Sequence, residues 1–219
     1  MGENARDGEV LPEILPIFPL SGVLLLPGAE LPLHIFEPRY RAMTRDALAG
    51  PGLIGLIQPR ADAAPDDRQP EIYPTGCMGR ITECRQTGDG RYHMTLIGIC
   101  RFRIHDELPL LDGYRRVTPN YAPFMGDLAL GRDARVDRDR LSGALAAYCA
   151  KRNFTANWDA IKQISDERLI SSLAMLCPFA ASEKQALLEA ADLTERGRVV
   201  IALLEMALLE GGESRPVKH

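Results

Sequence analysis

The first half of the chain consists of short apolar runs that prolines and glycines interrupt, a pattern typical of β-structure. The clearest run covers residues 91–105, where apolar and polar side chains alternate on both sides of a break at Gly98. Alternation with a period of two predicts strands that turn one face to a core and the other to solvent. We therefore predict a β-rich unit over residues 14–122.

Three shorter segments complete this unit. Residues 87–90 predict a hairpin turn, because two glycines around an aspartate tolerate the positive φ that such turns need. Residues 38–48 predict a single helix, because Pro38 suits a first helical position and the apolar side chains fall along one stripe. Residues 61–71 carry two prolines and several charges, and they predict an exposed loop.

From about residue 126 the spacing of apolar side chains becomes helical. We predict an α-helical bundle over residues 126–210, because the helices are too short to be stable alone and have to pack together or on the β unit. One helix is expected to end before Pro178, with the apolar stripe Leu169, Ile170, Leu173 and Leu176. The expected N-caps of three helices are Ser165, Ser182 and Thr194. The fold class is thus α+β, with a mainly antiparallel sheet followed by helices.

Composition limits the classes of partner. A formal net charge of −4 and a sequence pI of about 5.6 argue against extensive binding of nucleic acid or anionic membrane. The five cysteines include no C-x-x-C pair, so neither a disulfide framework nor a zinc site is indicated. Residues 1–13 show no secretion signal, and prolines and a charge break the apolar run at residues 23–33, which excludes a membrane span there. We expect a reduced, cytoplasmic protein.

Three segments carry a family resemblance. The first runs from residues 15–20 (LPIFPL) through 26–28 (LPG) to 31–40 (LPLHIFEPRY), the second covers 76–83 and 98–104, and the third covers 176–196. In order and spacing these segments are closely similar to the N-terminal domain of Lon proteases. The resemblance implies a PUA-like pseudo-barrel of mostly antiparallel strands followed by a helical bundle, and a role in substrate recognition.

A complete Lon protease also contains an ATPase module and a Ser–Lys protease module. The ATPase needs a G-x-x-x-x-G-K-[ST] loop, and this sequence contains no Gly-Lys pair. Only 9 residues follow Glu210, which leaves no room for a protease module. We therefore expect a free-standing, non-enzymatic module without catalytic residues, cofactor or metal. The alternative is the N-terminal fragment of a complete ATP-dependent Lon protease.

Histidines and cysteines offer little support for another chemistry. His34, His93 and His105 fall on polar strand faces, where a structural or surface role is favoured over a general base or metal ligand. No H-E-x-x-H or H-x-x-x-H spacing brings two imidazoles onto one helical face. Cys100 and Cys177 have apolar neighbours at the spacing of their elements, so we expect buried thiols rather than nucleophiles.

The corner formed by Phe36, Arg39 and Tyr40 is the strongest candidate for a binding site. In the structural interpretation, Pro38 starts a helix, Tyr40 packs inward and Arg39 pairs with an acid across the turn. In the functional interpretation, an aromatic–arginine corner beside an exposed edge grips an extended peptide, because such side chains give a large contact area. The structural interpretation is favoured, and peptide binding by Phe36, Arg39 and Tyr40 is kept as the functional hypothesis.

Arg80, Arg91, Arg101 and Arg103 are expected on one solvated sheet face, with an interaction surface as the alternative. RNA binding stays open as an alternative function, since PUA-like barrels elsewhere bind RNA. Residues 1–125 nevertheless hold 13 Arg and no Lys against 16 Asp and Glu, which argues against nucleic acid. The leading prediction is a protein- or peptide-binding module. Its expected partner is an unfolded or extended polypeptide, or a protease supplied in trans, with no membrane partner; homodimerisation is also left open.

Overall fold

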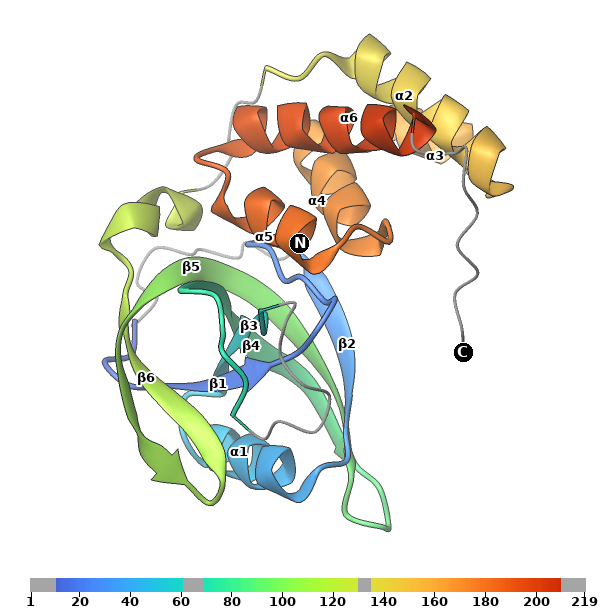
Figure 1. Ribbon diagram of the computed structural model, residues 1–219. Coiled ribbons are helices and arrows are strands. Elements are labelled where there is room, and N and C mark those ends of the chain that lie inside the picture. The colour runs from blue at the N-terminus through green and yellow to red at the C-terminus, as the bar shows by residue number, and fades with distance from the viewer. Residues whose placement is uncertain (1–10, 61–68, 130–134, 210–219) are drawn as a thin grey trace.

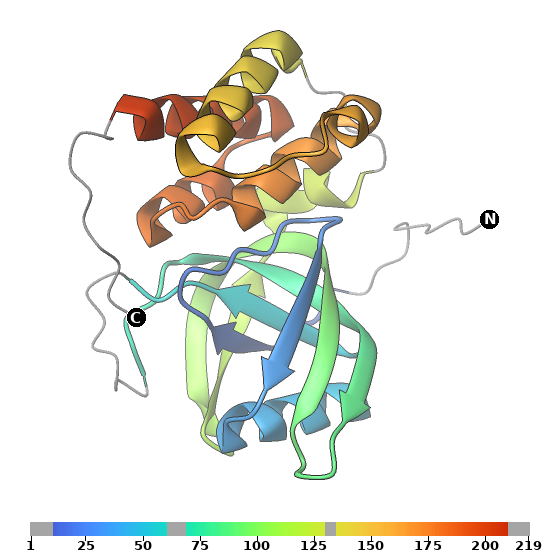
Figure 2. The same ribbon diagram turned by 90° about the vertical axis from the view of Figure 1, so that its right-hand side faces the viewer.

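The computed structural model describes residues 11–60, 69–129 and 135–209. A six-stranded barrel and a helical bundle are stacked end to end, as Figures 1 and 2 show from two sides. The barrel elements are β1 (Leu15–Pro19), β2 (Glu30–Ile35), α1 (Pro38–Ala49), β3 (Leu53–Ile57), β4 (Thr75–Gln86), β5 (Tyr92–Leu111) and β6 (Tyr114–Asn120). The short 3-10 helix η1 (Ala122–Leu128) leads to α2 (Arg138–Arg152), α3 (Trp158–Gln163), α4 (Asp166–Leu176), α5 (Ala181–Glu189) and α6 (Leu193–Leu209). The predicted α+β class is confirmed.

The sheet order is β2-β5-β4-β3-β1-β6, and β5 also pairs with β6. The pairings are antiparallel except for the parallel pair of β1 and β3. Strand β5 is 20 residues long, so its first half pairs with β2 and β4 while its second half pairs with β6. The barrel is closed through β5, and β2 is left at an edge with β5 as its strand partner.

Two glycines allow other parts of the chain to approach the barrel strands closely. Gly98 hydrogen-bonds to the loop before β2, with its N–H on Ala29 O (2.9 Å) and its own carbonyl accepting from Gly28 (2.8 Å). A side chain at Gly98 would overlap the Leu26 carbonyl oxygen, which accounts for the break in the alternating pattern. A Cβ at Gly76 would stand 2.7 Å from the Phe102 ring, which fills the barrel interior.

Helix α1 closes the end of the barrel that lies away from the bundle (Figures 1 and 2). Its start at Pro38 confirms the predicted helix, and its core-facing residues Tyr40, Met43, Thr44 and Ala47 are buried. The hairpin turn predicted at residues 87–90 is also confirmed: it joins β4 to β5, and Gly90 has a φ of +78°. Of the predicted loop at residues 61–71, residues 61–68 lie outside the described residues.

The helical bundle follows the predicted pattern with four corrections. Ser165 caps α4 as predicted, but α5 begins earlier than predicted, so Ser182 is not its cap; there Glu183 accepts the Ala180 N–H (2.6 Å). Thr194 is not the cap of α6, because Asp192 accepts the Glu195 N–H (2.8 Å) while Thr194 accepts from Arg135. Leu176 ends the predicted apolar stripe and is 82% exposed. Helix α3 was not predicted.

Arg101 joins the barrel to the bundle, contrary to the expectation of a solvated arginine face. Its side chain is 4% exposed and forms an ion pair with Asp127 of η1 (Nε–Oδ2, 2.8 Å). It also donates to the carbonyl oxygens of Leu188 (2.9 Å) and Ala190 (2.6 Å) at the end of α5. The prediction was wrong because the bundle covers this part of the outer sheet face, where β5 would otherwise meet solvent.

Candidate functional site

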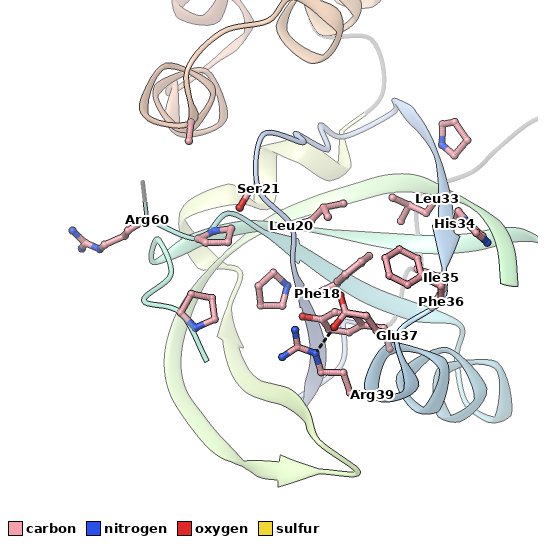
Figure 3. Close-up of a pocket in the computed structure, with 16 residues that line it drawn as sticks. Phe18, Leu20, Ser21, Leu33, His34, Ile35, Phe36, Glu37, Arg39 and Arg60 are labelled. Atoms are coloured by element: carbon pink, nitrogen blue, oxygen red, sulfur yellow. Dashed lines mark hydrogen bonds and ion pairs between the residues drawn. The ribbon is translucent and has the colours of Figure 1, made fainter. Parts of the chain in front are cut away.

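A cavity of about 700 Å³ opens on the side of the barrel, between β2, the end of β1 and the start of α1 (Figure 3). Phe18 and Leu20 come from β1 and its extension, and Leu33 and Ile35 come from β2. Arg60 lies on the opposite margin from His34, and Ala181 of the bundle completes the wall. The cavity therefore lies where the edge of the barrel meets the first turn of α5.

Phe36, Arg39 and Tyr40 all line this cavity, so the structure brings the predicted site residues together. The Arg39 guanidinium lies over the Tyr40 ring, 4.5 Å from its centroid. Its Nε donates to Glu37 Oε2 (3.0 Å), the pairing across the turn that the sequence suggested. Phe36 is 57% exposed, whereas Tyr40 is 5% exposed. The exposed aromatic and the buried one therefore have different surroundings within one site.

Tyr40 is part of the barrel wall. Its ring packs on Phe18, with 4.3 Å between the ring centroids. Burial raises the pKa of the Tyr40 hydroxyl above its ordinary value, so this group stays neutral. Phe36 has no such covering, and its ring lies 5.8 Å from the His34 ring at the rim of the cavity. Phe36 is thus an exposed apolar side chain at the rim of the cavity, and the Tyr40 ring lies under the Arg39 guanidinium.

The cavity carries more positive than negative charge. Among the described residues of its lining, Arg39 and Arg60 are basic and Glu37 is acidic. Arg60 is half exposed and lies 3.7 Å from the carboxylate of Glu71, which is 78% exposed. An ion pair that long and that exposed contributes little to stability. The chain as a whole carries a net charge of −4, so this site differs from the average surface.

His34 and His93 form a pair that the sequence did not reveal. They stand opposite each other on β2 and β5, with ring centroids 4.5 Å apart and planes at 8°. Both side chains lie on the exposed face, as predicted, and they border a second depression of about 490 Å³ beside β4. The imidazoles stack on each other, and each lies within 6 Å of an aromatic neighbour.

Four of the cysteine thiols are buried. Cys100 and Cys177 are buried, as predicted. Burial raises the pKa of the Cys177 thiol to about 11 and that of Cys77 well above its ordinary value, so both stay protonated at neutral pH. Within residues 11–60, 69–129 and 135–209, no three His, Cys, Asp or Glu side chains are grouped to hold a metal ion. No helix of this described part is long and apolar enough to cross a membrane.

Comparison with known families assigns residues 14–206 to the ATP-dependent protease La (LON) substrate-binding domain. The chain belongs to this family. Lon protease 2 of Myxococcus xanthus is 26% identical over 200 residues, which are 90% of this chain and 24% of that protein. Lon protease 2 of Thermus thermophilus is 26% identical over 208 residues, which are 92% of this chain and 25% of that protein. The LON-family chain thus spans about a quarter of the length of these curated relatives.

Solved structures show the same fold. A Lon N-terminal domain protein from Xanthomonas campestris has a TM-score of 0.59 at 22% identity, covering 86% of this chain and 97% of that chain. The N-terminal domain of the Mycobacterium avium complex Lon protease has a TM-score of 0.60 at 19% identity, covering 88% of this chain and 98% of that chain. The barrel followed by a helical bundle is therefore the fold of Lon N-terminal domains.

The sequence did not single out several residues of the cavity. Phe18 and Leu20 read as ordinary core positions, and Arg60 stands next to the predicted loop. One signal was available: Pro32 interrupts the apolar run of β2, and a proline within a strand indicates an edge. An edge strand next to an aromatic–arginine corner is the combination that marks this site.

Proposed function

We propose that this LON-family chain is a non-enzymatic module that binds unfolded or extended polypeptide in the cavity between β2 and α1. Phe36 and Arg39 contact the ligand, and Tyr40 positions Arg39. The observation that carries the proposal is the open cavity of about 700 Å³, which places an aromatic ring that is 57% exposed beside a guanidinium. Exposed aromatic and arginine side chains dominate binding energy at protein interfaces.

The proposal includes the context in which the module acts. A domain that holds unfolded chains serves either a protease supplied in trans or further modules of the same polypeptide, and both fit a substrate-binding family. Five free cysteines fit a reducing compartment such as the cytoplasm. RNA binding has less support than polypeptide binding, because Arg101 of the expected arginine face is buried.

The test is binding of a permanently unfolded, carboxymethylated protein to the full chain, measured by fluorescence anisotropy. Phe36→Ala is expected to weaken binding about thirtyfold, the scale of an interface hot spot. Leu48→Ala is the matched control, since Leu48 is 45% exposed, lies on α1 and is not part of the cavity lining. Absence of binding, or equal losses in both variants, would rule out this site.

A further inference from the structure

The free edge of β2 points into the same cavity. Six consecutive residues, 32–37, line it, and the first four of them belong to β2. Successive side chains of a strand point to opposite faces, so a cavity that touches every residue in a row touches the backbone edge as well as one face. The edge is available because, among the described strands, β2 pairs with β5 alone.

The register identifies the backbone groups that face the cavity. Gly98 donates to Ala29 O (2.9 Å), one step before the β2–β5 pairing that runs from Glu30–Ile97 to Ile35–Tyr92. Hydrogen-bonded and non-hydrogen-bonded pairs alternate along an antiparallel ladder. Leu31, Leu33 and Ile35 therefore bond to β5. The residues whose backbone groups point outward are Glu30, Pro32 and His34.

Two independent features agree with this assignment. Pro32 has no N–H, so its outward position leaves the β2–β5 ladder without a missing donor. Side chains approach most closely at non-hydrogen-bonded pairs, and His34 and His93 stack with centroids 4.5 Å apart.

We infer that an extended polypeptide segment binds by adding a strand to the free edge of β2. The inference rests on the proposed function and specifies how the ligand is held. A ligand residue opposite His34 exchanges two backbone hydrogen bonds with it, and a residue two positions away donates its N–H to the Pro32 carbonyl oxygen. Alternate ligand side chains then point toward Phe18 and Leu20, so the ligand is apolar at every second position.

The charges of the site restrict the ligand further. Among the described residues of the lining, Arg39 and Arg60 outnumber Glu37, and the Arg60 pair with Glu71 is long and exposed. A segment with an acidic flank is therefore favoured over one with a lysine flank. Backbone bonds make the site tolerant of sequence, while the apolar alternation and the charge supply a modest preference.

The experiment uses the full chain and a fluorescent nine-residue peptide of alternating valine and threonine with a glutamate at one end. Two further peptides carry N-methyl groups at all odd or all even positions. One methylated peptide is expected to bind at least about tenfold more weakly than the parent peptide. The affinity of the other should stay within about twofold of the parent, because only one set of N–H groups bonds to β2. Equal affinity of both methylated peptides, whether unchanged or reduced, overturns strand addition.

Chain variants provide the second arm. His34→Pro removes the outward N–H without touching the ladder to β5, and it is expected to weaken binding about tenfold, while His34→Ala stays within about threefold. Arg60→Glu should weaken binding of the glutamate-bearing peptide more than binding of the same peptide with glutamine in place of glutamate.

If the parent peptide does not bind at all, the proposed function fails as well. If light scattering shows a dimer that His34→Pro dissociates, while the peptide stays unbound, a second copy occupies the edge and the inference fails.

Discussion

Arg101 of β5 and Asp127 of η1 form a two-pronged ion pair in which both side chains are almost completely buried, with Nε–Oδ2 and Nη2–Oδ1 distances of 2.8 and 2.9 Å. The same guanidinium lies 4.7 Å from the centroid of the Phe124 ring and bonds to carbonyls at the end of α5. One side chain thus connects the barrel, η1 and the bundle.

Arg101→Ala is expected to lower the free energy of unfolding by about 3–5 kcal/mol, because it leaves Asp127 charged and buried without its partner. Urea unfolding followed by circular dichroism measures this loss. Arg103→Ala, on the same strand but exposed, is the control and should change stability by less than about 0.5 kcal/mol. The double variant Arg101→Met with Asp127→Leu should recover part of the lost stability, because no buried charge is left without a partner. The recovery stays incomplete because the Leu188 and Ala190 carbonyls lose their donor. A loss below about 1 kcal/mol in Arg101→Ala would contradict this account.

Gly98→Ala is expected to destabilise the barrel by more than the roughly 1 kcal/mol typical of point variants. The new methyl group would overlap the Leu26 carbonyl oxygen, so the loop before β2 or the strand itself has to move. Gly88→Ala is the matched control, since a Cβ there meets nothing within 4 Å. Thermal unfolding of the two variants should separate them by several degrees; similar melting temperatures would show that the loop yields easily.

The stability of the chain should fall as pH rises from about 9 to about 11, in part through Cys177. Burial raises the pKa of this thiol to about 11, so the unfolded chain loses the proton at a lower pH than the folded chain. The contribution is fully present below the ordinary thiol pKa and is lost as pH rises through the folded value, with a slope of at most about 1.4 kcal/mol per pH unit. Urea titrations at pH 8, 9.5 and 10.5 measure this slope. Cys177→Ala should make this slope shallower by at most the contribution of one proton, about 1.4 kcal/mol per pH unit. An unchanged slope would exclude Cys177 as a cause of the pH dependence.

Phe36→Ala and Tyr40→Ala are expected to separate binding from stability. Phe36 is exposed, so its removal should change the free energy of unfolding by less than about 0.5 kcal/mol while lowering the affinity for the ligand. Tyr40 packs on Phe18 inside the barrel, so its removal should cost about 3 kcal/mol. Tyr40→Phe keeps the packing and should leave both quantities close to the parent. Strong destabilisation by Phe36→Ala would assign that ring to the core instead.

The sequence predicted the elements whose signals are local. Helix α1 was predicted to within a residue, because Pro38 and the spacing of its buried side chains lie within the helix itself. The three residues Phe36, Arg39 and Tyr40 were placed together for the same reason, since they occupy one short turn.

Features that depend on distant parts of the chain could not be predicted in this way. Arg101 alternates with apolar residues as an exposed side chain would, and its burial depends on carbonyls 87 and 89 residues later. The caps of α5 and α6 were misplaced because Ser182 and Thr194 are good capping residues that stand inside helices which begin earlier. The edge position of β2 follows from the order of all six strands, and Pro32 was its one local signal.

The position of Arg101 also has a consequence for synthesis on the ribosome. The barrel strands are all present once Asn120 has emerged, yet the last carbonyl partner of Arg101, at Ala191, lies 90 residues further along the chain than Arg101 itself. At about 5–20 residues per second, a nascent chain takes roughly 4 to 14 seconds to make the stretch from Asn120 to Ala191. During this time Arg101 lacks its carbonyl partners in the bundle, so we expect a barrel that folds first to be less stable until the helices arrive.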